Sequence, residues 1–191
     1  MKFKFLSTNE AYDGTQLVSL RSYLSHGLLG DSIVAWVGPC EIRPEHMVDG
    51  EDLVQNAQIR GDGMLHFIVE IFDSTLFAAV GLQRLLASMV KDELMRTASA
   101  SHREIVSRLT RSGDDLYGDG KKLSISIATQ SPVSSLIHFA VNVVNEGTPV
   151  PTLALKDLGV EPRPLAEAVM AAFAEEVRTI RLATQKVRWV R

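Results

Sequence analysis

Two short segments, each with one apolar face and one face that carries polar residues, constrain the fold of this chain most. They read KLSISIA over residues 122–128 and LIHFAVNVV over residues 136–144, and the turn sequence GDG at 118–120 precedes the first of them. Because side chains alternate between the two faces of a strand, each segment predicts a strand with one apolar face. A third predicted strand, DDLYG at 114–118, comes before this turn, and the GDG sequence is a strong signal of a β-hairpin between DDLYG and the first alternating segment. Three strands in such close succession predict an antiparallel sheet.

The polar faces of these two strands carry an unusual set of side chains. If the strands are neighbours, one shared face holds five polar residues, namely Lys122, Ser124, Ser126, His138 and Asn142. The small side chains leave room above the sheet, and the lysine supplies one compact positive charge with three donors. This combination suits an anionic ligand, a carboxylate or a phosphate, whose body packs on apolar walls. The plain alternative is the solvent-exposed face of an antiparallel sheet, with His138 in a structural hydrogen bond.

The rest of the chain reads as helices and strands joined by polar turns. Apolar spacing predicts helices over 15–30, 73–98, 101–109 and 164–188. β-prone runs predict a strand that starts at 31 and stops at Pro39, and another over 64–72. Asp73 or Ser74 is the expected N-cap of the second helix. Strands grouped with flanking helices favour a single α+β domain over residues 1–191, with a largely antiparallel sheet covered by helices on one face.

Composition excludes several classes of protein. Apolar residues make up 46% of the chain, enough for a sizeable core, and the net charge of -3 lacks the basic surplus of a nucleic-acid-binding domain. The single cysteine, Cys40, cannot form an internal disulfide, fits a reducing compartment, and is interpreted as a buried or incidental thiol. No apolar stretch reaches the roughly 18 residues of a membrane span, and the N-terminal apolar run is too short for a signal peptide. We therefore expect a cytoplasmic protein that binds neither nucleic acid nor membranes.

A third strand adds a histidine and a glutamate to the predicted site. In HFIVEIFD, His66 and Glu70 share one face of the strand over 64–72. If this strand neighbours the strand of His138, the three side chains line one groove. Two imidazoles and a carboxylate can bind zinc, but the sequence has no dense ligand-spacing motif, which favours a hydrogen-bonded His–Glu pair that orients a ligand. Whether a metal is bound stays open.

Two segments resemble ligases that attach biotin or lipoate to proteins. DGKKLSISIA is similar to the ligase segment in which a lysine opens a strand after a tight turn, and HFAVNVV followed by LALKDLGV resembles the next strand of biotin ligases. The resemblance implies that Lys122 contacts a carboxylate and a mixed-anhydride phosphate, that Asp115 lies near phosphate or magnesium, and that Asn142 is the strand-end asparagine. It also implies ATP and magnesium as cofactors, although the arginine- and glycine-rich loop that covers the adenylate in biotin ligases does not occur in this sequence.

Over nearly its whole length the chain resembles an uncharacterised family, the domain of unknown function numbered 366. The segments that carry this resemblance are DGTQL, GDSIV, LHFIVEIFD, QRLL, GDDLY, KLSISIATQSPVSSLIHF and KVR. The resemblance implies a compact relative of the biotin/lipoate-protein ligase catalytic domain. It therefore implies an α+β fold of the type shared by class II aminoacyl-tRNA synthetases and biotin/lipoate ligases.

Together these features predict a small acidic ligand bound in a groove over the sheet. The candidate catalytic residues are Lys122 and His138, and the candidate ligand-binding residues are Asp115, Ser124, Ser126, Asn142, His66 and Glu70. If the protein is an enzyme, acyl or adenylyl transfer to an amine or thiol is the expected chemistry, with Lys122 stabilising negative charge. The alternatives are a non-catalytic binding protein and a metal-dependent hydrolase that uses His66, Glu70 and His138. A homodimer is compatible with the sequence.

Overall fold

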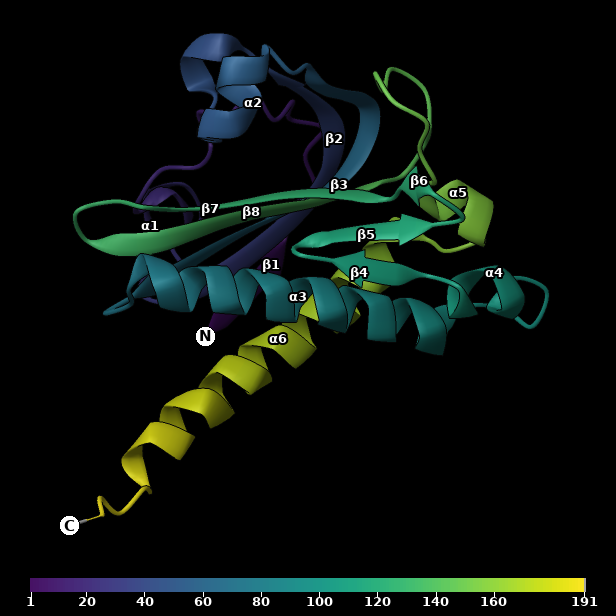
Figure 1. Cartoon of the computed structure of the whole chain (residues 1–191). Coiled ribbons are helices and arrows are strands. Elements are labelled where there is room, and N and C mark those ends of the chain that lie inside the picture. The colour runs from purple at the N-terminus through teal and green to yellow at the C-terminus, as the bar shows by residue number, and fades with distance from the viewer. Residues whose placement is uncertain (191) are drawn as a thin grey trace.

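A five-stranded sheet organises the computed structural model, which describes residues 1–190 (Figure 1). Its strands follow the order β1-β2-β3-β8-β7. The bounds are β1 Lys2–Phe5, β2 Ser32–Ile42, β3 Ile59–Phe72, β7 Ser124–Gln130 and β8 Ser134–Asn142. β1 pairs with β2 in parallel, and the other neighbouring strands pair antiparallel. The predicted α+β class with a largely antiparallel sheet is confirmed.

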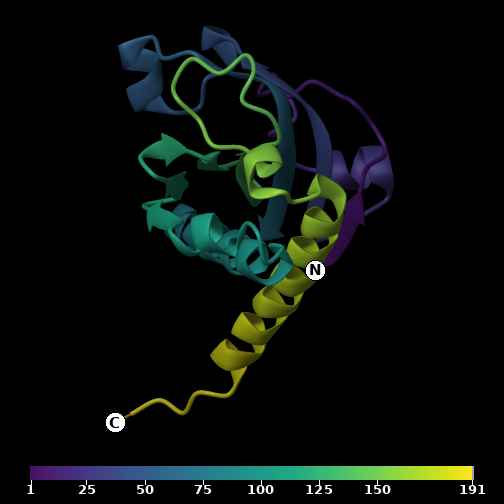
Figure 2. The ribbon, with the colours of Figure 1, turned by 90° about the vertical axis from the view of Figure 1, so that its right-hand side faces the viewer.

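Two long helices, α3 and α6, cover one face of this sheet (Figure 1, Figure 2). The helices are α1 Arg21–His26, α2 Gly50–Gln55, α3 Leu76–Thr97, α4 Arg103–Ser107, α5 Leu155–Leu158 and α6 Pro162–Gln185. Alternation along β3 turns Leu65, Phe67 and Val69 toward this layer, where they join a core that contains Leu86 of α3 and Phe173 of α6. Because apolar side chains of the sheet and of both helices are buried together here, this layer is the main core. Among the described residues, no helix is both long and apolar enough to span a membrane.

The opposite face of the sheet is buried as well. A second core on this face contains Leu6, Tyr12, Leu17, Val34, Trp36, Cys40, Met64, Ile68, Leu136 and Ala140. The first three of these residues come from the chain between β1 and α1, so this segment covers the face that α3 and α6 leave free. A solvent-exposed strand face, the plain alternative above, is therefore wrong. Polar side chains on this face lie in a buried layer, where they need hydrogen-bond partners.

The pairing of β7 with β8 turns the β7 serines toward the helices. Ser126 pairs with Phe139, which belongs to the main core, whereas Ile127 pairs with His138. Directly opposed residues of an antiparallel pair share a face, so the predicted grouping of Ser124 and Ser126 with His138 on one face is wrong. The physical reason is that β7 is an edge strand whose helix-side face meets α3 and β5, where the hydroxyls find hydrogen-bond partners.

A second, three-stranded sheet lies beside β7 and carries Lys122. Its strands are β4 Thr110–Ser112, β5 Asp115–Gly118 and β6 Lys121–Lys122, in the order β4-β5-β6. The predicted hairpin joins β5 to β6, and its turn residues Asp119 and Gly120 have positive φ angles of 50° and 76°, as two-residue hairpin turns of type I′ require. Leu123 separates β6 from β7, so the strand predicted to run unbroken over 122–128 is split after Lys122.

Two further boundaries near the N-terminus differ from the prediction. β2 continues through Pro39, because an irregularity between Gly38 and Cys40 leaves the proline outside the regular ladder, and bulges are where a sheet tolerates proline. The helix predicted over 15–30 is shorter in the structure, where α1 begins only at Arg21. Leu20 directly precedes it in a left-handed conformation, with φ of 65°, which helical backbone cannot adopt.

The long helix α3 starts from a different cap than expected. Thr75 is its N-cap, and the Thr75 side chain accepts a hydrogen bond from the Ala78 amide. Asp73 instead has a φ of 53° in the turn after β3, and Ser74 follows it outside the helix. The capping hydroxyl therefore comes one or two positions later than Ser74 or Asp73, where the backbone is extended as an N-cap requires.

Candidate functional site

A cavity of about 190 Å³ opens beside Lys122, on the side of the sheet opposite α3. Its walls come from β7 and β8, from the start of β5, from β6, and from the segment between β2 and β3 that contains α2. Its apolar lining includes Ile42, Ile59, Ile125 and Ile127, and its polar lining includes Lys122 and His138. We call it the Lys122 cavity. In Figure 1, α2 lies above the sheet and α3 below it, so this cavity faces away from the main core.

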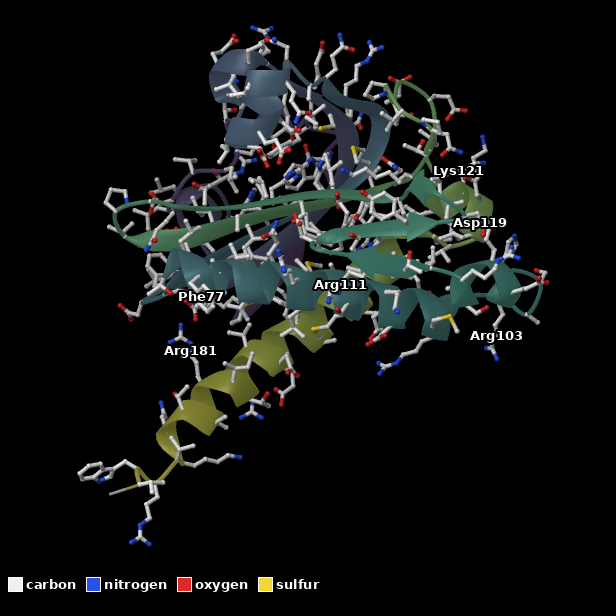
Figure 3. All side chains as sticks on the ribbon, viewed as in Figure 1. Phe77, Arg103, Arg111, Asp119, Lys121 and Arg181 are labelled. Atoms are coloured by element: carbon white, nitrogen blue, oxygen red, sulfur yellow. The ribbon has the colours of Figure 1, made fainter. Side chains whose placement is uncertain are left out.

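Lys122 supplies the positive charge of this cavity. Its Nζ lies 2.8 Å from Oδ2 of Asp115, and about a third of its side chain is exposed. Burial opposes the lysine charge, but the hydrogen bond and charge of Asp115 outweigh it, so the pKa of Lys122 is raised above its usual value. The preceding Lys121 is exposed and, like Asp119, projects outward at the end of the β5–β6 hairpin (Figure 3). Of this lysine pair, Lys122 is therefore the one that serves the cavity.

Four aspartates line the Lys122 cavity. Asp49 and Asp52 come from the N-cap and first turn of α2, and Asp114 and Asp115 come from the start of β5. Burial raises the pKa of Asp52, with help from the charge of Asp49, and burial also raises that of Asp115 against the opposing effect of Lys122. Oδ1 of Asp115 is buried without a hydrogen-bond partner in the described part of the chain. The cavity thus holds more carboxyl groups than ammonium groups, which the sequence did not indicate.

His138 and His66 form a buried chain of hydrogen bonds that ends at the cavity. His66 Nε2 lies 3.1 Å from the carbonyl oxygen of Gly38, and His66 Nδ1 lies 3.1 Å from His138 Nε2. A carbonyl oxygen can only accept, so the His66 proton is on Nε2. Burial lowers the pKa of His66 to about 4 and that of His138 well below its usual value, so both rings are neutral at pH 7. His66 Nδ1 therefore accepts from His138 Nε2–H, which leaves the lone pair of His138 on Nδ1.

Aromatic rings hold both imidazoles in place. The ring of Tyr12 stacks on His138 with centroids 3.6 Å apart and planes 10° apart. Trp36 stacks on His66 at 5.0 Å, and its Nε1 donates to the carbonyl oxygen of Glu10. Tyr12 is only 1% exposed and also lines the Lys122 cavity. Close packing of this kind fixes the orientation of His138, and with it the position of Nδ1.

Asn142 positions Lys122 and lines an adjoining cavity. Its Nδ2 donates to the carbonyl oxygens of Lys122 and Leu153, at 3.1 and 3.2 Å. The adjoining cavity has a volume of about 200 Å³ and a mainly apolar lining. Lys122 and Ile125 are among the residues that line both cavities. A ligand longer than the Lys122 cavity can therefore extend past the lysine.

The two serines of the predicted site pack β7 against its neighbours. Ser124 is fully buried, and its Oγ accepts from the Leu116 amide at 2.8 Å. Ser126 donates to the carbonyl oxygen of His138 and accepts from Nε2 of Gln83 in α3. Ser126 still contributes to the wall of the Lys122 cavity because it lies in the edge strand, whereas the cavity lining does not include Ser124.

Glu70 does not join the histidines. Its Oε1 accepts from the Leu20 amide at 2.8 Å and from the Ser134 hydroxyl at 2.7 Å, which ties β3 to the start of α1 and to β8. His66 uses both ring nitrogens in the chain described above, so neither is left for a metal. Within residues 1–190, no group of three or more metal-ligating side chains is arranged to hold an ion. The predicted groove of His66, Glu70 and His138 therefore does not form, and of the three only His138 lines the cavity.

Cys40 is a buried thiol, as interpreted from the sequence. It is 2% exposed in the second core, and burial raises its pKa to about 12. The thiolate is the nucleophilic form of cysteine, so this environment keeps Cys40 in its unreactive form.

Sequence reasoning missed the residues that long-range folding brings to the cavity. Asp49 is a recognisable N-cap, since its side chain accepts from the amides of Glu51 and Asp52. This local signal predicts the short helix α2 but not that α2 lies over the sheet. Tyr12 lies in a segment without apolar periodicity, and nothing in the sequence around it indicates a stacking partner on β8.

The chain matches a known protein family over nearly its whole length. The family described as domain of unknown function DUF366 matches residues 1–188. The chain belongs to the DUF366 family. The uncharacterized protein MJ0805 of Methanocaldococcus jannaschii is 30% identical over 166 residues, which cover 84% of this chain and 72% of that protein. A protein of unknown function from Pyrococcus horikoshi has a similar solved structure, with a TM-score of 0.89, 38% identity and 100% coverage of both chains.

Solved ligases share the fold of this DUF366 protein at lower similarity. A biotin protein ligase from Aquifex aeolicus, in complex with biotin and ATP, has a TM-score of 0.59 and 16% identity, covering 93% of this chain and 70% of that one. The protein Ta0514 from T. acidophilum, solved with bound lipoic acid, has a TM-score of 0.56 and 15% identity over 93% and 86% of the two chains. At such identities the likeness concerns the fold, and the predicted biotin/lipoate ligase fold is confirmed.

Proposed function

We propose that this DUF366 protein binds a small carboxylate- or phosphate-bearing ligand in the Lys122 cavity and that its chemistry is acyl or adenylyl transfer. The observation that carries the proposal is the Lys122 ammonium, which keeps its charge at the junction of two cavities. One compact ammonium suits one carboxylate or one phosphate oxygen. The ligand would join or replace Asp115, whose Oδ2 now lies 2.8 Å from the lysine Nζ.

The apolar walls suit the body of such a ligand. Ile125 and Ile127 form one side of the cavity, and Ile42 and Ile59 come from the segment around α2. Pockets for small organic ligands combine apolar walls with a few polar groups that fix orientation. One protein of the same fold was solved with biotin and ATP, and another was solved with lipoic acid. Biotin and lipoic acid each carry one carboxylate on an aliphatic chain. Compounds of this class are therefore the first ligands to test.

Magnesium held at the acidic side of the cavity would bring the phosphates of ATP beside Lys122. Oδ1 of Asp115 is buried without a partner among the described residues, and Asp114 lines the cavity next to it. Magnesium is bound by one or two carboxylates together with substrate phosphates, so Asp114 and Asp115 would hold the ion and Lys122 the phosphate. Bound ATP would supply activation of the ligand carboxylate as a mixed anhydride. Lys122 would then stabilise the negative charge of the phosphate oxygens.

A non-catalytic binding protein is the second candidate. The sequence contains no arginine- and glycine-rich loop of the kind that covers the adenylate in biotin ligases. A protein with this cavity and without such a loop would bind the acid alone. The two candidates differ in whether ATP and magnesium add to the effect of the acid.

Thermal unfolding tests the proposal and separates its two forms. Octanoate, lipoate and biotin are each added alone and with magnesium and ATP, to the wild type and to two variants. Lys122→Met removes the cavity charge, and Lys121→Met is the matched control because its lysine is exposed beside it. A ligand at a hundred times its Kd stabilises a protein by about 2.7 kcal/mol, which raises the melting temperature of a chain of this size by roughly 5–10 °C.

The expected result is a rise in melting temperature for the wild type and Lys121→Met that is absent in Lys122→Met. A further rise with ATP and magnesium supports transfer, and a rise with the acid alone supports the binding protein. If Lys122→Met responds to the acids as the wild type does, the anionic group does not bind in the Lys122 cavity.

A further inference from the structure

We propose that the ligand of the Lys122 cavity also carries an amino group, which donates a hydrogen bond to Nδ1 of His138. This inference rests on the proposed function and names the substrate class: a small compound with a carboxylate or phosphate at one end and an amino group at the other. The anionic end binds Lys122, and the amino end lies against His138 and Tyr12, which also line the cavity.

His138 lines the cavity, and the ring nitrogen left to a ligand is Nδ1, which is an acceptor and not a donor. Its side chain is almost fully buried, and its Nε2 is occupied by His66. The Gly38 carbonyl sets the tautomer of His66, and His66 in turn sets that of His138. Within the described residues, Nδ1 of His138 has no hydrogen-bond partner, while the residue lines the cavity. A ligand that donates to this acceptor therefore gains a hydrogen bond.

Tyr12 adds a second polar group beside His138. It is buried, it lines the cavity, and its ring lies parallel to that of His138. In the part of the chain that the structure describes, its hydroxyl has no hydrogen-bond partner. A tyrosine hydroxyl both donates and accepts. An amino group has more than one N–H, so it can satisfy His138 Nδ1 and the Tyr12 hydroxyl together.

The charges of the cavity favour an amino group over a second anionic group. Lys122 is already paired with Asp115, and Asp49, Asp52 and Asp114 add further carboxyl groups. A ligand with negative groups alone would meet more like than opposite charge, and like charges brought together disfavour binding. An ammonium group on the ligand balances this excess. The ligand class is therefore zwitterionic rather than purely acidic.

Isothermal titration calorimetry with three matched series of compounds tests this class. The first series consists of ω-amino carboxylic acids of three to eight carbons, and the second of plain carboxylic acids of the same lengths. The third consists of ω-trimethylammonio acids, which keep the positive charge but have no N–H. A hydrogen bond from a charged donor is worth enough to favour the best amino acid over its two counterparts by roughly tenfold or more.

Two variants assign the effect to its groups. His138→Phe keeps a ring beside Tyr12 and removes the acceptor, so it should abolish the preference for the amino series and leave the plain acids bound. Lys122→Met should weaken all three series. If amino and plain acids bind equally well to the wild type, or if His138→Phe keeps the preference, the inference is wrong and the proposed function stands. If the amino series still binds to Lys122→Met unchanged, the anion site is wrong and the amino site stands. If no series binds to the wild type, both are wrong.

A spectroscopic measurement on the wild type covers the case in which His138→Phe does not fold. Nitrogen-15 spectra of the histidine side chains report which ring nitrogen carries the proton. The inference requires the proton on Nε2 in both His66 and His138, and a shift of the His138 Nδ1 signal when the tightest-binding amino acid is added. A proton on Nδ1 of His138, or an Nδ1 signal that does not move at saturation, would overturn it.

Discussion

The neutral His66–His138 pair should make this protein less stable in acid. In the unfolded chain both imidazoles take up protons near the usual pKa of 6.5, whereas in the folded chain burial lowers the pKa of His66 to about 4 and that of His138 well below 6.5. Below 6.5 the unfolded state therefore binds more protons than the folded state. The free energy of unfolding then falls as the pH falls, and the contribution of these groups is fully present only above 6.5.

The size of this effect follows from the pKa of His66, which is fully buried. At 1.36 kcal/mol per pKa unit, His66 alone lowers the free energy of unfolding by about 2 kcal/mol between pH 7 and 5, and by about 3 kcal/mol at pH 4. Urea unfolding followed by circular dichroism at both pH values measures it in the wild type and in His66→Gln. Asp52 and Asp115, whose pKa values burial raises, act in the opposite direction in both proteins and cancel in the difference.

The variant should lose about 2 kcal/mol less than the wild type between pH 7 and 5. Equal losses would mean that His66 is as readily protonated in the folded chain as in the unfolded one. In that case His66 Nδ1 could not accept from His138, and the assignment of the His138 lone pair to Nδ1 would fail with it.

Two further predictions concern residues that the structure assigns to stability. Glu70→Ala should lower the free energy of unfolding by about 3 kcal/mol, because the Leu20 amide and the Ser134 hydroxyl lose their acceptor. Calorimetry should find the ligand affinity of this variant unchanged. A weaker affinity in the folded variant would mean that Glu70 contributes to ligand binding. Thr75→Ala should cost about 1 kcal/mol through loss of the α3 N-cap. Ser74→Ala should cost less in the same urea experiment, and a larger cost for Ser74 would contradict the assigned cap.

Alternation predicted which residues share a face, but not which face turns to the helices. In β3 and β8 the more apolar face is also the face toward the helices, because Phe67 and Phe139 are large and apolar and pack in the core with α3 and α6. In β7 the more apolar face, with Ile125 and Ile127, lies on the cavity side. The serine face lies toward the helices, where hydrogen bonds to Gln83 and Leu116 satisfy the hydroxyls. Hydropathy cannot distinguish a satisfied buried serine from an exposed one.

The local part of the candidate site was readable from the sequence and the long-range part was not. Lys122 and Asp115 come together across a two-residue turn, and His138 follows on a strand whose alternation is unambiguous. Asp52 and Tyr12 reach the same cavity from segments without periodicity, and their placement depends on tertiary packing against the sheet. The acidic character of the cavity depends on that packing, so composition and spacing could not indicate it.

The most direct test of the proposed site is a crystal structure with the compound that gives the largest thermal shift. The proposal predicts its carboxylate or phosphate within hydrogen-bond distance of Lys122 Nζ, about 2.7–3.2 Å, and its body between Ile125 of β7 and the α2 segment. A ligand bound elsewhere on the molecule, with Lys122 still paired only to Asp115, would contradict it.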